Sequence, residues 1–273
     1  MPFIRTSPRI TPPPASMSGA LGWSRSHRLI GTGRRLDHAV IIPAFNEAER
    51  IKPTIESIYD HFSSRHESRF EVIVVDDGSR DNTREKVLGM TLDHPDLVLT
   101  PRRQNFGKGF SVKQGMLAST AARSLFMDAD GSTPISELDK LEDAFESGYD
   151  IAIGSRWAAG ADIRLHQPFY REAMGQTFRF IVKMAAGLDI DDTQCGFKGF
   201  TRDAAADIFL RQKVDRFAFD VEVLFLAQKL GYKIAEIPIT WTNSPSSKVN
   251  PFTDPAKMFL DVMRVRWMHR GDR

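Results

Sequence analysis

The sequence predicts an α/β protein with a mostly parallel central sheet that is covered by helices on both faces. Short apolar segments suited to buried strands alternate with segments of helical periodicity through the first half of the chain. The segments between them are short, so little indicates a break between domains. Polar clusters follow several of the expected strands, and ligands of such sheets bind beyond the carboxyl ends of the strands.

The expected elements follow one another from residue 38 onward. Strands are expected at 38–45, 70–79, 97–101, 123–130 and 150–156. The helices between them are expected at 47–62, 82–88, 109–122 and 135–146. The first helix has the clearest pattern, because four apolar residues recur at helical spacing: Ile51, Ile55, Ile58 and Phe62.

The second half of the chain is less regular. We expect helices at 169–186, 217–230 and 255–267, a strand at 233–241 and a glycine-punctuated loop at 191–200. Four apolar residues of the last helix fall nearly on one side, namely Phe259, Val262, Met263 and Trp267. Three arginines add positive charge near its end, namely Arg264, Arg266 and Arg270. Residues 37–273 are predicted to form one domain, with halves at 37–160 and 161–273.

The net charge of +2 conceals an asymmetry along the chain. Residues 1–36 contain six arginines and no acid, and subtracting those six from +2 leaves −4 for residues 37–273. This distribution argues against a nucleic-acid binder with a basic face. Residues 1–36 also hold five of the fifteen prolines, which predicts a disordered tail. The tail is either a dispensable extension or a basic arm that touches anionic lipid.

Cysteine usage and hydropathy bear on the cellular location. Cys195 is the only cysteine, so no internal disulfide can form, which fits a reducing cytoplasm. No apolar run approaches the ~18–20 residues that cross a bilayer. Prolines and arginines interrupt the N-terminal segment where a secretory signal would lie. We therefore expect a cytoplasmic protein that meets a membrane peripherally, at its cytoplasmic face.

Asp128 and Asp130 follow an apolar segment, with only Ala129 between them. Carboxylates repel at this spacing, and their oxygens are the ligands that Mg²⁺ and Mn²⁺ prefer. Two aspartates at a strand end can hold such an ion while it bridges a diphosphate. Because D-x-D also occurs by chance and in helix caps, the assignment depends on the neighbouring motifs.

Several further motifs occur in a characteristic order. The first half contains IIPAFNEAERI (41–51), VIVVDDGSRDNT (72–83), NFGKG (105–109), DADGS (128–132) and GSRW (154–157). Together they resemble the family 2 glycosyltransferases, which have the GT-A fold. The second half contains DTQCGFKGF (192–200), FAFDVEVL (217–224) and SSKVNPF (246–252), which resemble the dolichyl-phosphate glucosyltransferase branch. The resemblance covers nearly the whole chain except the tail.

The resemblance implies an inverting, metal-dependent transfer of a hexose to a polyprenyl phosphate. It favours UDP-glucose as the donor and Mg²⁺ or Mn²⁺ as the cofactor. The alternatives are GDP-mannose as donor, a glycan or small-molecule hydroxyl as acceptor, or a catalytically silent module that binds a nucleotide sugar. A Rossmann-type dehydrogenase is excluded, because the first expected strand ends in PAFNE without the glycines of G-x-G-x-x-G.

The same resemblance implies the residues that bind the nucleotide sugar: Pro43, Ala44, Phe45, Asn46, Glu47, Asp76, Lys108, Asp128 and Ala129. Asp76 would accept a hydrogen bond from the base or ribose, and Lys108 would reach the base or diphosphate. Asp128 and Asp130 are the expected metal ligands, with most of the coordination on Asp130 and a weak contribution from Ser132. Local chemistry offers another interpretation of Asn46, as an N-cap with Glu47 in the first helical turn.

The acceptor decides which other side chains are needed. An ionised phosphate needs cationic clamps and no general base, and Arg156 and Arg171 are the candidates. Ser247 and Lys248 resemble the family's serine–lysine pair that reaches the phosphates. A hydroxyl acceptor would need a carboxylate base, for which the candidates are Asp192, Asp220 and Glu222. Asp192 is equally interpretable as an organiser of its loop.

Many polyprenyl-phosphate transferases carry membrane helices, which this sequence does not predict. Attachment through the amphipathic last helix and its arginines is one alternative. The others are a separate anchor protein and a soluble acceptor. Ordinary packing of that helix on the sheet would explain its apolar side equally well.

Overall fold

The computed structural model describes residues 36–65, 69–165, 182, 186–243 and 254–271. Residues 35–273 form one compact unit, to which all the elements below belong. The predicted tail and nearly all of the predicted helix at 169–186 lie outside the described residues. Within the described part of the chain, no helix combines the length and apolar character needed to cross a membrane.

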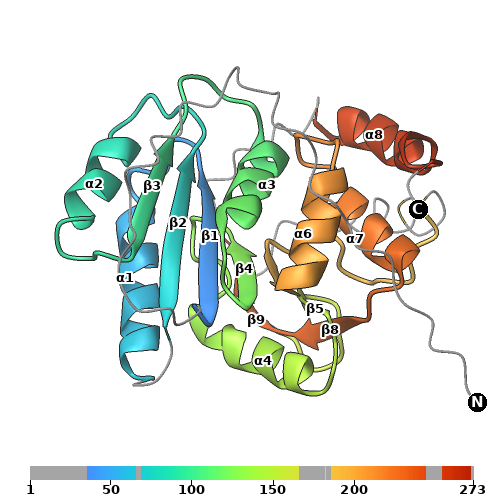
Figure 1. Ribbon diagram of the computed structural model, residues 1–273, viewed down its shortest axis with the longest axis horizontal. Coiled ribbons are helices and arrows are strands. Elements are labelled where there is room, and N and C mark those ends of the chain that lie inside the picture. The colour runs from blue at the N-terminus through green and yellow to red at the C-terminus, as the bar shows by residue number, and fades with distance from the viewer. Residues whose placement is uncertain (1–35, 66–68, 166–181, 183–185, 244–253, 272–273) are drawn as a thin grey trace, which may run out of the picture. The chain divides into compact units, whose positions relative to one another are not determined.

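A seven-stranded sheet forms the centre of the molecule (Figure 1), with the strand order β3-β2-β1-β4-β7-β5-β8. Its strands are β1 (His38–Ala44), β2 (Phe70–Asp76), β3 (Leu97–Pro101), β4 (Arg123–Met127), β5 (Ile151–Ser155), β7 (Phe197–Thr201) and β8 (Ile234–Pro238). All neighbouring strands pair in parallel except β7, which is antiparallel to both β4 and β5. Strands β6 (Asp162–Leu165) and β9 (Thr240–Thr242) form a separate small sheet. The predicted α/β class with a mostly parallel sheet is confirmed.

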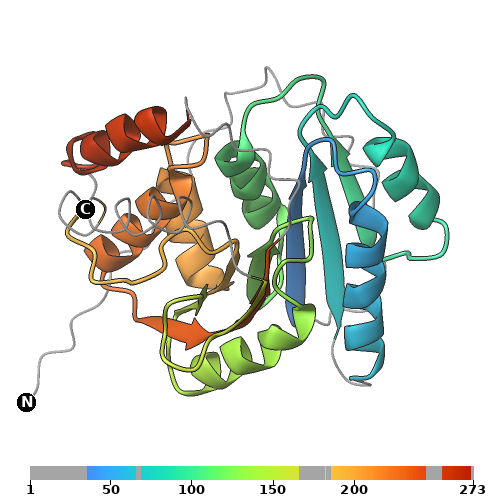
Figure 2. The same ribbon diagram turned by 180° about the vertical axis from the view of Figure 1, so that it is seen from behind.

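Helices cover both faces of this sheet. They are α1 (Ile51–Ser63), α2 (Thr83–Met90), α3 (Lys108–Ala118), α4 (Leu138–Glu146) after a 3₁₀ turn at Ile135–Glu137, α6 (Arg202–Arg211), α7 (Phe219–Leu230) and α8 (Asp254–Met268). Helices α3 and α6 lie in front of the sheet in Figure 1, whereas α1 and α4 lie in front of it in Figure 2.

Side-chain alternation along the strands divides the core into two clusters. In β1, Ala39 and Ile41 belong to the cluster that also contains residues of α3, α6 and α7, whereas Val40 and Ile42 belong to the cluster with α1, α2 and α4. The expected helical stripe Ile51, Ile55, Ile58 and Phe62 is buried in that second cluster. A strand buried on both faces needs a continuous apolar run, which explains the sequence pattern of β1 and β2.

The prediction of a loop at 191–200 is wrong for its last residues, because Phe197–Thr201 is strand β7. Both faces of this strand are covered, and a side chain at Gly199 would require the neighbouring side chains to move. A Cβ there would meet the Phe145 ring at 3.0 Å. Gly199 therefore marks close packing in a central strand, although it resembles loop punctuation in the sequence. Helix α6 and strand β6 are further elements that the sequence pattern did not predict.

Two other boundaries differ from expectation in ways that matter for function. Strand β4 ends at Met127, so that Asp128 and Asp130 lie in the turn beyond it. The predicted strand 233–241 is divided at Ile239 into β8 and β9, which belong to different sheets. Because β4 and β8 end earlier than expected, the residues after each of them lie beyond the carboxyl ends of parallel strands, where a ligand site is expected.

Candidate active site

A cavity of about 350 Å³ lies beyond the carboxyl ends of β1 and β4. Eleven residues predicted to act in binding or catalysis line it: Pro43, Ala44, Phe45, Glu47, Lys108, Asp128, Ala129, Asp130, Ser132, Arg156 and Asp220. Asn46, Asp76 and Asp192 are not among the lining residues. Arg171, Ser247 and Lys248 lie outside the described residues, so their roles stay predictions.

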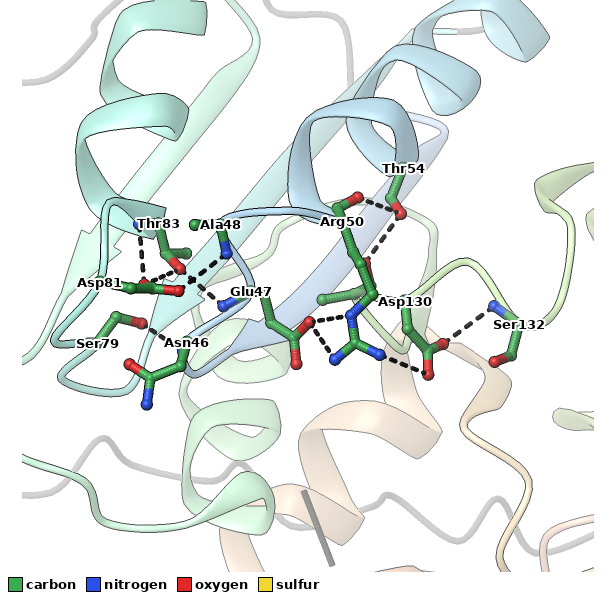
Figure 3. Close-up of polar contacts among 11 residues, drawn as sticks. Asn46, Glu47, Ala48, Arg50, Thr54, Ser79, Asp81, Thr83, Asp130 and Ser132 are labelled. Carbon is green, nitrogen blue, oxygen red and sulfur yellow. Dashed lines mark hydrogen bonds and ion pairs between the residues drawn. The ribbon is translucent and has the colours of Figure 1, made fainter. Parts of the chain in front are cut away.

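The loop that leads from β1 to α1 is held by the loop after β2 (Figure 3). The backbone amides of Asn46, Glu47 and Ala48 donate to side-chain oxygens of Ser79, Thr83 and Asp81 at 2.8–3.1 Å. Asn46 adopts a left-handed backbone conformation with φ 56°, which an asparagine tolerates better than most residues. Its side-chain oxygen accepts from the Arg80 amide at 2.8 Å. Asn46 therefore organises the loop and does not cap α1, whose N-cap position is Arg50.

The first aspartate of the predicted metal pair is packed between two other segments. The Asp128 amide donates to the Gly196 carbonyl at 3.1 Å, and the carboxylate lies where a Cβ on residue 196 would collide with it. The Lys108 ammonium, at the first turn of α3, lies 2.6 Å from Asp128 Oδ1. Burial lowers the pKa of Lys108, but the Asp128 and Asp220 carboxylates outweigh it and hold that pKa above its ordinary value.

The second aspartate is positioned by the start of α1 and by its own turn. Asp130 Oδ1 accepts from the Ser132 amide at 3.0 Å, and Oδ2 lies 3.7 Å from Arg50 Nη1. The Thr54 hydroxyl donates to the Ala129 carbonyl at 2.9 Å, which ties α1 to the turn (Figure 3). Gly131, with φ 64°, supplies the left-handed residue that this tight turn needs.

The donor set of this turn fits a divalent cation that takes its remaining ligands from a substrate. Among the residues that the structure describes, no group of three or more His, Cys, Asp or Glu could hold a metal ion by itself. Mg²⁺ commonly uses one or two carboxylates together with phosphate oxygens and water, which matches Asp128 and Asp130.

The charge balance of the cavity also favours a bound divalent cation. Four of the described lining residues are cationic, namely Arg50, Lys108, Arg156 and Arg216, and five are acidic, namely Glu47, Asp77, Asp128, Asp130 and Asp220. The cavity wall thus has no excess positive charge to attract a diphosphate, and a divalent cation would reverse that balance.

The adjacent aspartates after β2 have different surroundings. Asp76 is fully buried, and its Oδ2 accepts from Arg84 Nε and Nη2 at 2.9 and 2.8 Å. Asp77 lines the cavity and accepts from the Phe106 and Gly107 amides at 2.9 and 2.8 Å, so it fixes the NFGKG loop. Burial raises the pKa of Asp77 despite these hydrogen bonds. The acid pair was recognisable in the sequence, but which of the two faces the cavity was not.

Arg156 is held at the cavity wall by Asp192. Arg156 Nε and Nη2 donate to the two Asp192 oxygens at 2.7 and 2.8 Å, and the Arg156 amide donates to the same carboxylate at 2.9 Å. The Arg156 guanidinium also lies over the Trp241 ring at 5.4 Å. Burial raises the pKa of Asp192, but Arg156 outweighs this and lowers it below its ordinary value. This geometry supports Asp192 as the residue that positions Arg156, a role that neither sequence interpretation, a base or an organiser of its own loop, had described.

The other acid candidates also differ in position. Asp220 lines the cavity and forms an ion pair with the fully buried Lys198, and burial raises the pKa of Asp220. Glu222 is fully buried, contacts His269, and accepts from the Lys213 and Val214 amides at 2.8 Å. Glu222 is not among the lining residues, so only Asp220 of these two faces the cavity.

Cys195 is buried, and burial raises the pKa of its thiol to about 12. It therefore stays protonated near neutral pH, as expected of a packing residue and not of a nucleophile. Lining residues that the sequence interpretation missed include Arg50, Asn105, Gln194, Arg216 and Trp241. Arg50, Asn105 and Gln194 stand inside the motifs IIPAFNEAERI, NFGKG and DTQCGFKGF, which were the available indication for them.

A mostly parallel sheet with an aspartate pair and cationic side chains at its carboxyl edge is the arrangement of a GT-A glycosyltransferase. The comparisons with known proteins support this assignment. Residues 39–209 match the family model described as glycosyl transferase family 2. The chain belongs to this family and is a glycosyltransferase, as its motifs predicted.

Relatives with known names match most of the chain. The dolichyl-phosphate beta-glucosyltransferase of Dictyostelium discoideum is 35% identical over 242 residues, which cover 85% of this chain and 74% of the relative. The protein of the same name from Homo sapiens is 33% identical and covers 84% and 74%. The predicted resemblance to this branch is confirmed.

A solved structure confirms the fold. Glucosyl-3-phosphoglycerate synthase from Mycobacterium tuberculosis, in a complex with Mn²⁺, UDP and glucosyl-3-phosphoglycerate, matches with a TM-score of 0.60. The alignment covers 84% of this chain and 78% of the synthase, at 18% sequence identity.

Proposed function

We propose that this glycosyltransferase transfers glucose from UDP-glucose to dolichyl phosphate or a related polyprenyl phosphate, with inversion at the sugar carbon and with Mg²⁺ or Mn²⁺. The observation that carries the proposal is the convergence of Asp128 and Asp130 with Lys108 and Arg156 on one cavity. The names of the relatives support the sugar and the acceptor. Complexes of the same fold with Mn²⁺ or Mg²⁺ and UDP support the donor and the cation.

Different residues of the cavity would bind the donor and the acceptor. Asp128 and Asp130 would hold the cation, which when bound offsets the charge that develops on the departing diphosphate. Lys108 is already ionised and lies beside the same turn, where it can contact a phosphate oxygen. Arg156, held by Asp192 in one orientation, presents a fixed cation for the acceptor phosphate.

A phosphate acceptor needs no general base, because its oxygen is already ionised at neutral pH. The engagement of Asp192 and Glu222 in other contacts agrees with this chemistry. Asp220 favours the second candidate function, transfer to a hydroxyl, because it lines the cavity and burial raises its pKa. Its ion pair with Lys198 weighs against that role.

A membrane surface is part of the proposal, because the acceptor is a lipid. Four apolar side chains of α8 are 40–67% exposed, namely Phe259, Leu260, Met263 and Trp267. Val262, which the helical pattern placed on their side, is instead buried and packs α8 on the core. Exposed arginines of the same helix, Arg264 and Arg266, suit anionic lipid headgroups. We place the enzyme peripherally at a cytoplasmic membrane face, with a separate anchor protein as the alternative.

The test is a donor-by-acceptor screen. Radiolabelled UDP-glucose or GDP-mannose is incubated with dolichyl phosphate, undecaprenyl phosphate or soluble glycans, with and without EDTA. The proposal expects label in the organic phase from UDP-glucose and a lipid phosphate, and its loss with EDTA. Asp130→Ala should abolish turnover, whereas Asp93→Ala, which removes an exposed carboxylate of a surface turn, should not change it.

Two results would contradict the proposal. A water-soluble labelled product that is lost in Asp220→Asn would establish the hydroxyl acceptor. Binding of UDP-glucose without turnover under any acceptor would indicate a silent binding module. For the membrane, flotation with phosphatidylserine vesicles should be lost in Met263→Ser/Trp267→Ser and kept in Leu92→Ser, which changes an exposed leucine of another region. Equal flotation of both variants would contradict attachment through α8.

A further inference from the structure

Arg50 stands where the local physics of a helix disfavours a cation. It is the N-cap residue of α1, with no hydrogen bond from its side chain to the helix amides, and the first turn of α1 contains no acid. The N-terminal end of a helix carries partial positive charge, and Ser, Thr, Asp or Asn is preferred at the cap. The stability of the helix therefore does not explain an arginine at this position. The explanation has to lie in the residues around the Arg50 side chain.

Those surroundings hold the guanidinium in one orientation between two carboxylates (Figure 3). Arg50 Nε and Nη2 lie 2.7 and 2.5 Å from Glu47 Oε2, and Nη1 lies 3.7 Å from Asp130 Oδ2. Glu47 is itself fixed, because its amide donates to the Thr83 hydroxyl at 2.8 Å. Both Glu47 and Arg50 line the cavity, and Arg50 is only about one-fifth exposed.

The backbone from which Arg50 projects is fixed to the aspartate turn. Thr54, one helical turn further along α1, donates its hydroxyl to the Ala129 carbonyl at 2.9 Å and to the Arg50 carbonyl at 3.0 Å. Arg50 therefore cannot leave the vicinity of Asp130 by a movement of the helix unless this contact breaks. A metal cation that binds Asp130 therefore binds next to the positively charged Arg50 guanidinium.

We propose that Arg50, clamped by Glu47, makes binding of the divalent cation at Asp130 conditional on the nucleotide diphosphate. This inference rests on the proposed function, which supplies the diphosphate. Without a nucleotide, the guanidinium repels the cation and competes for Asp130 Oδ2. With a diphosphate bound, its negative charges offset both positive charges, and Arg50 adds a contact to the phosphates. Departure of the diphosphate after transfer would then also weaken binding of the cation.

The experiment measures Mn²⁺ affinity of the full chain, from the electron paramagnetic resonance of free Mn²⁺, with and without UDP. Without UDP, the neutral variants Arg50→Gln and Arg50→Met should bind Mn²⁺ about tenfold more tightly than wild type, since a like charge near the ion is removed. Arg50→Lys retains the charge and should stay within about threefold of wild type. With UDP, the advantage of the neutral variants should disappear.

Lys52→Gln is the matched control. It removes one positive charge from the same helix, at a side chain that is 59% exposed and paired with Glu56, and it should leave Mn²⁺ affinity unchanged. Either neutral Arg50 variant is sufficient if the other does not fold.

The outcomes separate this inference from the proposed function. If wild type binds Mn²⁺ with UDP but the neutral Arg50 variants match its affinity without UDP, the inference is wrong and the proposed function stands. A gain of affinity in Lys52→Gln equal to that in Arg50→Gln would also overturn it, because the effect would then be one of net charge. If wild type binds no Mn²⁺ even with UDP, the metal-dependent proposed function fails together with the inference.

Discussion

The two ends of the sheet both carry clusters of ionisable side chains, and the cluster at the carboxyl end lines the cavity. At the amino end of β1, Glu142 lies 2.7 Å from His38 Nε2 and 2.6 Å from Arg65 Nη1, and Asp139 contacts both Arg65 and His61. At the carboxyl end, Asp128, Asp130, Lys108 and Arg156 surround about 350 Å³ of open volume. At the amino end Arg65 pairs with Asp139 and Glu142, whereas the charged groups at the carboxyl end face the cavity as well as their partners.

This difference teaches that a cluster of ionisable residues does not by itself mark an active site. Opposite charges at the amino end join Arg65, just after α1, to Asp139 and Glu142 of α4 and contribute to stability. The charges at the carboxyl end need supporting partners behind the cavity, such as Asp192 for Arg156 and Lys198 for Asp220. Changes at the two ends should therefore have separable effects on stability and on turnover.

The largest effect is expected from Lys198→Met. Lys198 is fully buried, and its removal leaves the buried Asp220 carboxylate without its ion-pair partner. Breaking such a pair costs about 3–5 kcal/mol, whereas replacing both partners by apolar residues costs much less. Urea unfolding of Lys198→Met and of the double variant Lys198→Met/Asp220→Leu would measure this. A loss below about 1 kcal/mol in the single variant would show that Asp220 is neutral in the folded protein.

Asp192→Asn should mainly reduce turnover. It keeps the shape of the side chain but removes the charge that holds Arg156, so the guanidinium loses its fixed orientation at the cavity wall. We expect kcat to fall about a hundredfold, the size of effect produced by misplacing a positioned group. Steady-state kinetics should show the change in kcat and a smaller change in the KM for the nucleotide sugar. A selective rise in that KM would instead place Asp192 on the donor side.

Glu142→Gln should change stability and leave turnover within about twofold. His38 and Arg65 overcome the effect of burial and lower the pKa of Glu142 to about 2. A carboxyl whose folded pKa lies below its unfolded value of 4.5 stabilises the protein above about pH 4.5, and this stabilisation is lost as the pH falls toward 2.

We therefore expect Glu142→Gln to be less stable than wild type by about 2 kcal/mol at pH 7. The gap should narrow as the pH falls below about 4.5. Denaturant unfolding at several pH values would measure it, with Glu56→Gln on the exposed side of α1 as the control. A gap that stays constant from pH 7 to pH 3 would contradict the assigned cause.

The smallest effect is expected at the loop between β1 and α1. Asn46 combines a left-handed backbone with a side-chain hydrogen bond to the Arg80 amide. Asn46→Ala should lose the hydrogen bond and strain the backbone, at a cost of about 1–2 kcal/mol. Asn46→Gly should lose only the hydrogen bond and cost roughly half as much. Thermal unfolding of the two variants would compare them, and equal losses would mean that the backbone conformation is not strained.

The chemical identity of the site was predictable because its main residues are adjacent in sequence. Pro43 to Glu47 follow one buried strand, and Asp128 to Asp130 follow another, so an alternating pattern and the geometry of parallel sheets suffice to bring them together. The roles of Asp76 and Asp77 were not predictable in the same way. Asp76 ends β2 and Asp77 follows it, and only the contacts with Arg84 and with the NFGKG loop decide which faces the cavity.

By itself, the sequence determined the strand–helix alternation, the family and the acids at the carboxyl edge, because these depend on local periodicity and on short motifs. The tertiary structure decided the features that depend on partners far away along the chain. Strand β7 is inserted antiparallel between β4 and β5, and it pairs with residues 70–78 positions away in β4 and 45–49 positions away in β5, which no local pattern specifies. The same long-range packing pairs Asp192 with Arg156 and Arg50 with Asp130, and so decides which charges support the site and which face the cavity.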